Sequence, residues 1–432
     1  MPLSPLDSSL LRPVDTPARL HVPLATRAKV ESPVAVAPGT VVAHGEALAR
    51  GAAEGGAQAL APTSGRVVGV STVTLTNGQD VPAVELEVDY EDRRTPEAPH
   101  TPEEVARRAD PIDKAAPDSL GLWIDRLRGH GVWADRLTSP DLIGQLHQIL
   151  RRPIDTIVCN AVDHDPGVRL QSVVGARFGS VLVRGLELLA RLTSARNTWV
   201  AIEAGGQPKW WQPLRREMRD AGVELAPVLA DYPQADPTLL VYALLRRRLR
   251  PGRPPVEQGV LVLDAAAAVA VGRAAWRDQP MLHVPVAVRD HLRGGRTHYL
   301  AVPIGTPVRH LLDHLKLPHD GVGLFRGDVP RGQLVCPTAI VAGGELVLHV
   351  RHAMPPIIPD PCIRCGWCAH VCPTRVHPAG VLEAAQRGDQ DLADHYGIDA
   401  CVECGVCDEV CPSHLPLLGG IRHLKAARHG GE

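Results

Sequence analysis

The chain has 432 residues, of which 44% are hydrophobic and 22% charged, as expected for a globular protein of several domains. Its formal net charge is −2 and only 3% of its residues are aromatic, so neither a positive field nor a base-stacking surface favours a nucleic acid partner. No stretch reaches the ~20 apolar residues of a membrane-spanning helix, and the N-terminal MPLSPLDSSLLRPVDTP lacks the layout of a signal peptide.

The first predicted domain, residues 1–95, is rich in short strands. The pieces ESPVAVAPGTVVAHGEALARG and ALAPTSGRVVGVSTVTL are β-prone and are separated by Pro-Gly, His-Gly and Ser-Gly turns. Their pattern resembles the barrel-sandwich fold of biotinyl and lipoyl carrier domains. The hairpin tip AAEGGAQ has no lysine to carry a prosthetic group. We therefore expect a structural or docking module rather than a swinging arm.

Residues 96–278 predict a Rossmann-like α/β domain, which begins with a charged, Pro-rich connector. Strands and amphipathic helices alternate, a rhythm that implies a mostly parallel sheet. Ser139 is the expected N-cap of the first helix and Gly222 the stop of a later one. The predicted elements are helix SPDLIGQLHQIL, strand IDTIVCNAV, helix VGARFGSVLVRGLELLARLTSA, strand NTWVAIEAG, helix KWWQPLRREMRDAG, strand VELAPVLADYP and the strand–helix unit GVLVLDAAAAVAVGRAAW.

Two further modules complete the chain. Residues 279–352 return to β structure with one helix and fit a β-grasp module, and residues 353–432 hold eight of the ten cysteines. The other two, Cys159 and Cys336, lie in apolar stretches and are expected to be buried small hydrophobes. The fold class is therefore multidomain α/β.

The eight cysteines form two runs of identical spacing, CIRCGWCAHVCP and CVECGVCDEVCP. Each is C-x2-C-x2-C-x3-C-P, the bacterial ferredoxin spacing for a [4Fe-4S] cluster. In this arrangement the first three thiolates of a run bind one cluster and the fourth reaches across to the other. We expect one set to be Cys362, Cys365, Cys368 and Cys411, and the other Cys372, Cys401, Cys404 and Cys407.

Zinc and disulfides are the alternatives. Structural zinc sites commonly combine two CxxC pairs, and disulfides are unusual without an export signal. The duplicated spacing favours two cubane clusters, whose role is to pass single electrons.

The order of these modules resembles the RnfC (RsxC) family, which belongs to the Rnf ion-translocating electron transport complex. The likeness runs from about residue 20 to about 427. It is most specific in CIRCGWCAHVCPTRVHP and CVECGVCDEVCPSHLPLLGGIRHLKA, and extends to APTSGRVV, to VPIGTPVRHLL at the start of an SLBB-type β-grasp module, and to ADYPQADPTLLVYALLRRRLRPGRPP.

The resemblance implies a cofactor set and a setting. In that family the middle domain resembles the NADH-binding flavoprotein of respiratory complex I, binds FMN and takes a hydride from NADH. The family's proteins sit peripherally on the cytoplasmic side of the inner membrane. They exchange electrons with membrane flavin subunits, an iron-sulfur subunit, ferredoxin or NADH.

Three loops depart from the family's flavin motifs. GHGVWADRLTSP keeps Gly129 and Gly131 of a Gly-rich loop, but places Val, Trp and Asp where small residues are expected. CNAVDHDP keeps Asn160, and Asp163 and Asp165 preserve its acidic character. YPQADP has Ala where the family has Gly. We expect FMN and NADH binding to be weakened or lost; if a pocket persists, these five residues are its candidates.

The sequence thus predicts an electron-transfer subunit of a membrane-bound Rnf-type complex that relays electrons through two [4Fe-4S] clusters. Two alternatives remain open. One is a flavin-dependent NADH dehydrogenase or corrinoid-type reductase of the same architecture. The other is a non-catalytic iron-sulfur wiring subunit that has lost flavin binding.

Overall fold

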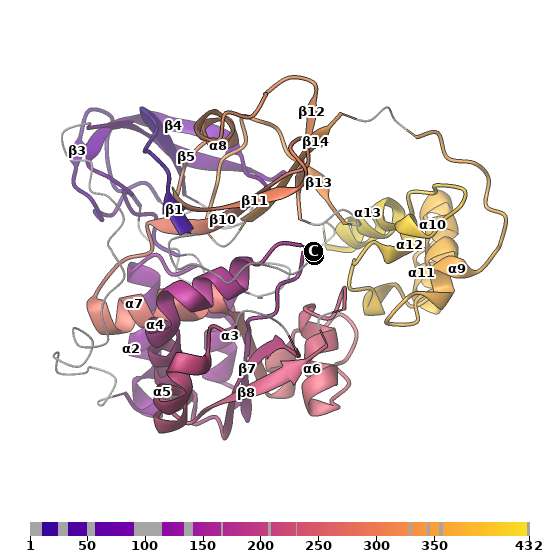
Figure 1. The fold of residues 1–432 in the computed structure, drawn as a ribbon, viewed down its shortest axis with the longest axis horizontal. Coiled ribbons are helices and arrows are strands. Elements are labelled where there is room, and N and C mark those ends of the chain that lie inside the picture. Colours follow the sequence, from indigo (N-terminus) through magenta and orange to yellow (C-terminus); the bar gives the residue numbers. More distant parts are fainter. Residues whose placement is uncertain are drawn as a thin grey trace.

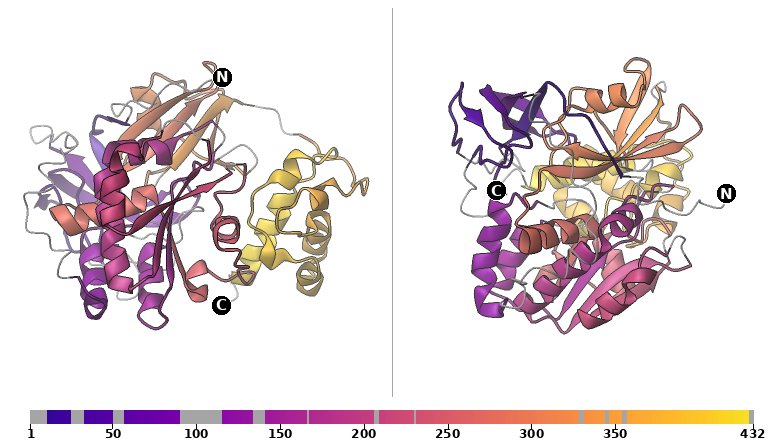
Figure 2. Two further views of the ribbon diagram at one scale, coloured as in Figure 1. Left: turned by 60° about the horizontal axis from the view of Figure 1, so that its bottom comes forward. Right: turned by 60° about the vertical axis from the view of Figure 1, so that its left-hand side comes forward.

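The computed structural model describes residues 11–24, 33–49, 57–89, 115–133, 141–165, 167–205, 209–229, 231–327, 331–343, 346–353 and 357–429. Two β-rich modules lie side by side above the α/β domain, and a helical C-terminal domain stands at one side (Figure 1). The views of Figure 2 show the same grouping from two further directions. No helix among the described residues combines the length and apolar character needed to cross a bilayer.

The N-terminal β module is an antiparallel four-stranded sheet in the order β2-β5-β4-β3. Its alternating burial arises because successive strand side chains point to opposite faces, and the inner face encloses a small apolar core. The tip of the predicted carrier-like hairpin lies outside the described residues. The strands are β2 (Arg19–Pro23), β3 (Val41–Val42), β4 (Gly65–Thr74) and β5 (Asp80–Val88).

A second β module follows the α/β domain in sequence. Its six-stranded mixed sheet has the order β1-β11-β10-β14-β12-β13, with α8 as its one helix, as the sequence predicts. The N-terminal strand β1 pairs in parallel with β11, so this short strand adds to the second sheet rather than to the first. The elements are β1 (Leu11–Pro13), β10 (His283–Asp290), β11 (Arg296–Pro303), α8 (Val308–His314), β12 (Val322–Arg326), β13 (Gln333–Leu334) and β14 (Leu346–His352).

Backbone hydrogen bonds join the two β modules. Ile340 N donates to Thr74 O at 2.9 Å, and His21 N donates to Gly305 O at 2.9 Å. Gly305 has a φ of +93°, and a Cβ there would lie 3.0 Å from the His21 backbone. A glycine is therefore required where the two backbones meet.

The α/β domain is built on a parallel sheet in the order β8-β7-β6-β9. The chain passes from β6 outward to β8 and then returns to the other side of β6, so the carboxyl ends of β6 and β9 flank a topological switch point. Every residue of β6 and β9 is buried, which reflects cover on both faces. The strands are β6 (Thr156–Asn160), β7 (Asn197–Glu203), β8 (Val223–Val228) and β9 (Val260–Asp264).

Helices cover both faces of this sheet. The larger apolar core lies on the side of α2, α3, α4 and α7, and a smaller one lies under α6. On the larger side α4 crosses α7 at two glycines, Gly185 and Gly272. The helical elements are η4 (Pro117–Ser119), α2 (Leu120–Gly129), α3 (Leu142–Ile149), α4 (Leu170–Thr193), η5 (Gln212–Leu214), α5 (Arg215–Asp220), α6 (Pro237–Leu245), η6 (Pro255–Gln258) and α7 (Ala265–Arg277).

Several local predictions can be compared with this domain. Ser139 lies outside the described residues, and Asp141 caps α3 by accepting a hydrogen bond from Ile143 N at 3.1 Å. Cys159 is buried in the larger core, as predicted. The prediction for Cys336 is wrong, because this cysteine is exposed, in the loop after β13.

The C-terminal domain consists of short helices around its own apolar core. It lies beside the α/β domain and the second β module in Figure 1. Its two shortest helices, α9 and α12, fall inside the two cysteine runs. The elements are α9 (Trp367–His370), α10 (Pro378–Arg387), α11 (Gln390–His395), η7 (Ile398–Ala400), α12 (Val406–Glu409) and α13 (Leu417–His429).

Candidate iron-sulfur centres

The two cysteine runs fold alike, residue for residue. In each, a glycine in the left-handed region precedes a one-turn helix that carries the third cysteine; these are Gly366 (φ +80°) before α9 and Gly405 (φ +74°) before α12. Arg364 and Glu403 also match, with φ values of +58° and +54°. Side chains other than glycine rarely adopt this conformation, so its repetition at equivalent positions marks a backbone that winds tightly.

Backbone N–H groups point at sulfur in the same repeated pattern. Arg364 N donates to Cys362 Sγ and Glu403 N to Cys401 Sγ, each at 3.4 Å. The fourth cysteine of each run accepts from the residue four places on, at 3.3 Å for Cys372 and 3.5 Å for Cys411. Such hydrogen bonds favour the thiolate and are one of the means by which proteins tune iron-sulfur potentials.

Four cysteines from both runs surround one cavity. Its lining includes Cys372 from the first run and Cys401, Cys404 and Cys407 from the second, and it holds about 340 Å³ of space free of protein atoms. These four form the second of the two expected sets. Apolar side chains close the cavity, among them Val402, Val406, Leu418 and Ile421.

The other expected set also spans both runs. Burial raises the pKa of the Cys368 thiol, and the neighbouring Cys365 and Cys411 raise it further. Cys411 is therefore the neighbour of the first run's thiols, although it ends the second run. Cys368 and Cys407 share an apolar cluster with Leu417, which brings the two sets close together.

The donor set suits iron-sulfur clusters. Burial raises the pKa of Cys401 to about 11, and burial with Asp408 and two neighbouring thiols also raises that of Cys407. These groups become thiolates when a metal centre supplies positive charge. A zinc site would need its sulfurs at about 2.3 Å from one ion. Across the described part of the chain, no three Cys, His, Asp or Glu side chains converge in the manner of single-ion ligands.

The predicted flavin residues at the switch point already make internal contacts. Asn160, the last residue of β6, donates from Nδ2 to Ala235 O at 2.8 Å and accepts from Val162 N at 3.3 Å. Asp163 accepts from Gln171 N at 2.7 Å and from Ser172 Oγ at 2.6 Å. Its carboxylate therefore caps the start of α4.

Burial raises the pKa of Asp163 to about 7, although the hydrogen bonds from Ser172 and Gln171 oppose this shift. Asp165 is buried nearby, and its carbonyl accepts from Val168 N at 3.0 Å. A flavin bound at this edge would compete with these contacts. The loops therefore fit FMN poorly, and the roles of Asn160, Asp163 and Asp165 in cofactor binding stay predictions.

The two retained glycines lie where the α/β domain meets the N-terminal module. A Cβ on Gly131 would lie 3.2 Å from Gln58 O and 3.2 Å from Leu60 Cδ1, and Gly129 lies near the Gln58 side chain. Val132 is fully buried in the main core. The rest of this loop, including Asp135, lies outside the described residues, as does Pro166.

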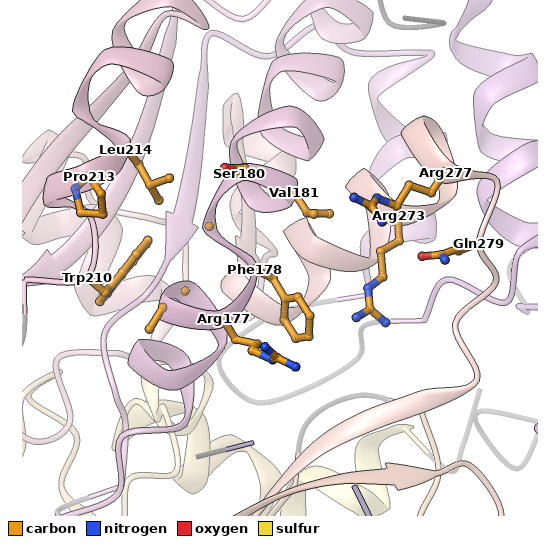
Figure 3. Close-up of a pocket in the computed structure, with 13 residues that line it drawn as sticks. Arg177, Phe178, Ser180, Val181, Trp210, Pro213, Leu214, Arg273, Arg277 and Gln279 are labelled. Carbon is orange, nitrogen blue, oxygen red and sulfur yellow. The ribbon is translucent and has the colours of Figure 1, made fainter. Parts of the chain in front are cut away.

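A separate cavity lies at a kink in α4. Phe178 has non-helical backbone angles there, and the Arg273 and Arg177 guanidinium groups lie 4.5 and 5.7 Å from the centre of its ring. Figure 3 shows Trp210, Pro213 and Leu214 on the opposite side of the helix from Arg273 and Arg277. No predicted flavin residue is among the described residues that line it.

Sequence reasoning missed the contact between the α/β domain and the cysteine domain. The Tyr232 hydroxyl donates to the carbonyl of Cys404, and the Tyr232 ring meets the His164 ring edge-on, with centroids 5.2 Å apart. Arg331 Nη1 lies 3.1 Å from His164 Nε2. The YPQ segment is visible in the sequence, but its partner is 172 residues away.

Three family descriptions match successive parts of the chain. They are the RnfC Barrel sandwich hybrid domain over residues 7–91, the Nuo51 FMN-binding domain over residues 145–273, and the 4Fe-4S dicluster domain over residues 359–415. Their order is that of the modules described above. The last match covers both cysteine runs.

Several curated relatives are named as the RnfC component of an ion-translocating oxidoreductase complex. That of Rhodobacter capsulatus is 26% identical over 88% of this chain and 72% of its own length. The Pasteurella multocida protein is 25% identical over 74% of this chain and 39% of its own length, and one from Haemophilus influenzae 23% over 97% and 63%. The chain thus spans from about two fifths to about three quarters of these relatives.

Among solved structures, an NAD+-reducing [NiFe]-hydrogenase in the H2-reduced state aligns at a TM-score of 0.46 and 15% identity, covering 78% of this chain and 67% of that chain. A TM-score below 0.5 does not define the fold, which rests on the elements above. The module order, the duplicated cysteine runs and the relatives agree. The chain is a divergent homologue of the RnfC proteins of ion-translocating oxidoreductase complexes, and its C-terminal domain carries two [4Fe-4S] clusters.

Proposed function

We propose that this chain is an electron-relaying subunit of an Rnf-type complex that couples electron transport to ion translocation. The observation that carries the proposal is the cavity lined by Cys372 together with Cys401, Cys404 and Cys407. One cysteine from the first run joins three from the second, which is the crossed ligand pattern of two-cluster ferredoxins. We assign Cys362, Cys365, Cys368 and Cys411 to the other cluster.

The clusters, when bound, supply one-electron chemistry, and the chain's own residues set the conditions for it. The cysteine thiolates bind iron, and backbone N–H groups such as those of Arg364 and Glu403 donate to the thiolates. Apolar side chains such as Leu418 and Ile421 keep water from the second set. Hydrogen bonding and burial are both means by which a protein tunes cluster potentials.

The setting is inferred from the relatives. Their name places them in a multi-subunit ion-translocating oxidoreductase complex. We infer that the partners are the membrane flavin subunits and an iron-sulfur subunit of such a complex, with ferredoxin or NADH as the distal electron carrier. The chain would bind peripherally on the cytoplasmic side of the inner membrane.

The contacts of Asn160 and Asp163 favour a relay without its own flavin. Both side chains are engaged within the fold, so FMN binding at the switch point is weakened. The alternative is a flavin-dependent NADH dehydrogenase or corrinoid-type reductase, which the match to an FMN-binding domain supports. In either case the α/β domain would hold the second cysteine set through Tyr232.

The test is the metal and flavin content of the chain purified without oxygen. We expect about eight irons per chain, a paramagnetic signal at low temperature after reduction, and no bound flavin. Stoichiometric FMN with NADH-driven dye reduction would favour the dehydrogenase instead. Zinc in place of iron, or no paramagnetic signal, would exclude the relay.

A further inference from the structure

An apolar patch surrounds the first cysteine run. Ile358, Ile363 and Trp367 are 87%, 67% and 59% exposed, and Ile357 lies exposed beside them in sequence. Cys362 and Cys365 within the run are also exposed. We call this surface the first-run face. Contiguous exposed apolar side chains are uncommon on a monomer and mark sites of interaction.

The duplicated run provides an internal control for this exposure. Ile363 corresponds to Val402, and Trp367 corresponds to Val406. Both valines line the second cavity and are partly buried, with Leu418 and Ile421 of α13 completing the lining. The fold of the run therefore does not require exposed side chains at these positions. The chain itself covers one run and leaves the other open.

The two runs also differ in charge. Residues 362–376 contain two arginines, Arg364 and Arg375, and no Asp or Glu, which gives a formal charge of +2. The equivalent residues 401–415 contain Glu403, Asp408 and Glu409 and no Lys or Arg, which gives −3. The residues at 364 and 403 occupy the same left-handed position but carry opposite charges.

The acidic charge of the second run is neutralised within the chain. Glu403 accepts from Arg422 Nε at 3.2 Å and from Lys425 Nζ at 3.0 Å, both on α13. Arg364 and Arg375 are exposed on the surface. The first-run face thus combines apolar side chains with exposed cations. The surface that complements it is apolar with an acidic surround.

The second set is turned toward the interior of the molecule. Tyr232 of the α/β domain reaches the carbonyl of Cys404, and Arg422 Nη2 on α13 donates to Arg331 O at 3.2 Å. Figure 1 shows α9 on the outer side of the domain, while α12 and α13 lie nearer the sheets. A protein that exchanges electrons from outside therefore meets the first set before the second.

We propose that the first-run face is the docking site for a one-electron redox protein whose cofactor lies within an acidic surface. This inference rests on the proposed relay function and specifies where the relay is reached from outside. In the exchange the partner protein loses one electron and this chain gains one, or the reverse. No covalent bond forms or breaks.

Binding of an oxidised, acidic, bacterial two-cluster ferredoxin to the anaerobically purified chain tests the proposal. Ile358→Glu, Trp367→Glu and Arg364→Glu each place negative charge on the face, and each should weaken binding by about tenfold or more. The matched control is Leu122→Glu, because Leu122 is 75% exposed on α2 of the α/β domain. Binding to the parent chain should weaken as salt rises from about 0.05 to 0.3 M.

Iron content and the reduced paramagnetic spectrum of every variant separate this proposal from the relay itself. Absence of cluster signals in the parent refutes the relay. Intact clusters in all variants with unchanged ferredoxin binding, or no binding to the parent at low salt, refutes the docking site alone. Two other outcomes also overturn it: a dimer that Ile358→Glu dissociates, or face-dependent binding to anionic phospholipid vesicles without ferredoxin binding.

Discussion

Replacement of Gly185 by alanine tests the packing that supports the α/β domain. Gly185 lies where α4 crosses α7, and a Cβ there would be 2.1 Å from Ala268 O and 2.9 Å from Gly272 N. Both atoms belong to backbone, so no side chain can move aside. To restore even a 3.0 Å separation from the carbonyl oxygen, the helices would have to part by about 0.9 Å.

Two effects oppose each other in this variant. Alanine is favoured over glycine within a helix by up to about 1 kcal/mol. Overpacking of a close contact typically costs about 1–3 kcal/mol, and a gap of under 1 Å between separated helices forfeits part of their dispersion energy. We expect overpacking to dominate, so that Gly185→Ala destabilises the domain by about 1–2 kcal/mol.

Hydrogen exchange measures this effect within the domain, which matters because a multidomain chain does not unfold in one step. Amides of α4 and α7 in Gly185→Ala should exchange about tenfold faster than in the parent. The matched control is Gly121→Ala on α2, where an added Cβ meets no atom within 4 Å. The reasoning about the crossing is refuted if both variants are equally protected, or if Gly185→Ala is the better protected.

Three further outcomes follow from the site. Cys411→Ser combined with Cys368→Ser should cost about half of the iron, whereas Cys411→Ser combined with Cys407→Ser should disrupt both clusters; metal analysis and paramagnetic spectra decide between these patterns. Asp163 has a pKa raised to about 7, so between about pH 4 and 7 the folded chain holds the extra proton and stability falls as pH rises. The melting temperature of Asp163→Asn should therefore fall less than that of the parent from pH 5 to 7.5. Tyr232→Phe removes a hydrogen bond worth about 1 kcal/mol, so hydrogen exchange in the second cysteine run should quicken while the iron content stays unchanged.

The cysteine runs show what the sequence can predict. Cluster ligation depends on spacing within about a dozen residues, and the backbone needed for it is local, including glycines at 366 and 405. Strands such as β6 and β9 were also predictable, because continuous apolar runs between turn signals indicate buried parallel strands.

Contacts between distant segments were not predictable in this way. Asp163 follows a strand, where an acidic residue can serve a cofactor or cap a helix, and only the structure shows its bonds to Gln171 and Ser172. Cys336 illustrates the reverse error. Its apolar neighbours suggested burial, but the loop after β13 leaves it exposed.

The difference between the two cysteine runs comes from what packs against them, not from their spacing. Lys425 and Arg422 of α13 pair with Glu403, while Arg364 at the equivalent position lies at the surface. Tyr232 fixes the covered run to the α/β domain. If that domain has lost its flavin, it still determines which cysteine set faces inward and which is accessible to a redox partner. Its retention is then explained by the positioning of the relay, and this function requires neither a glycine-lined loop nor a free carboxylate at the switch point.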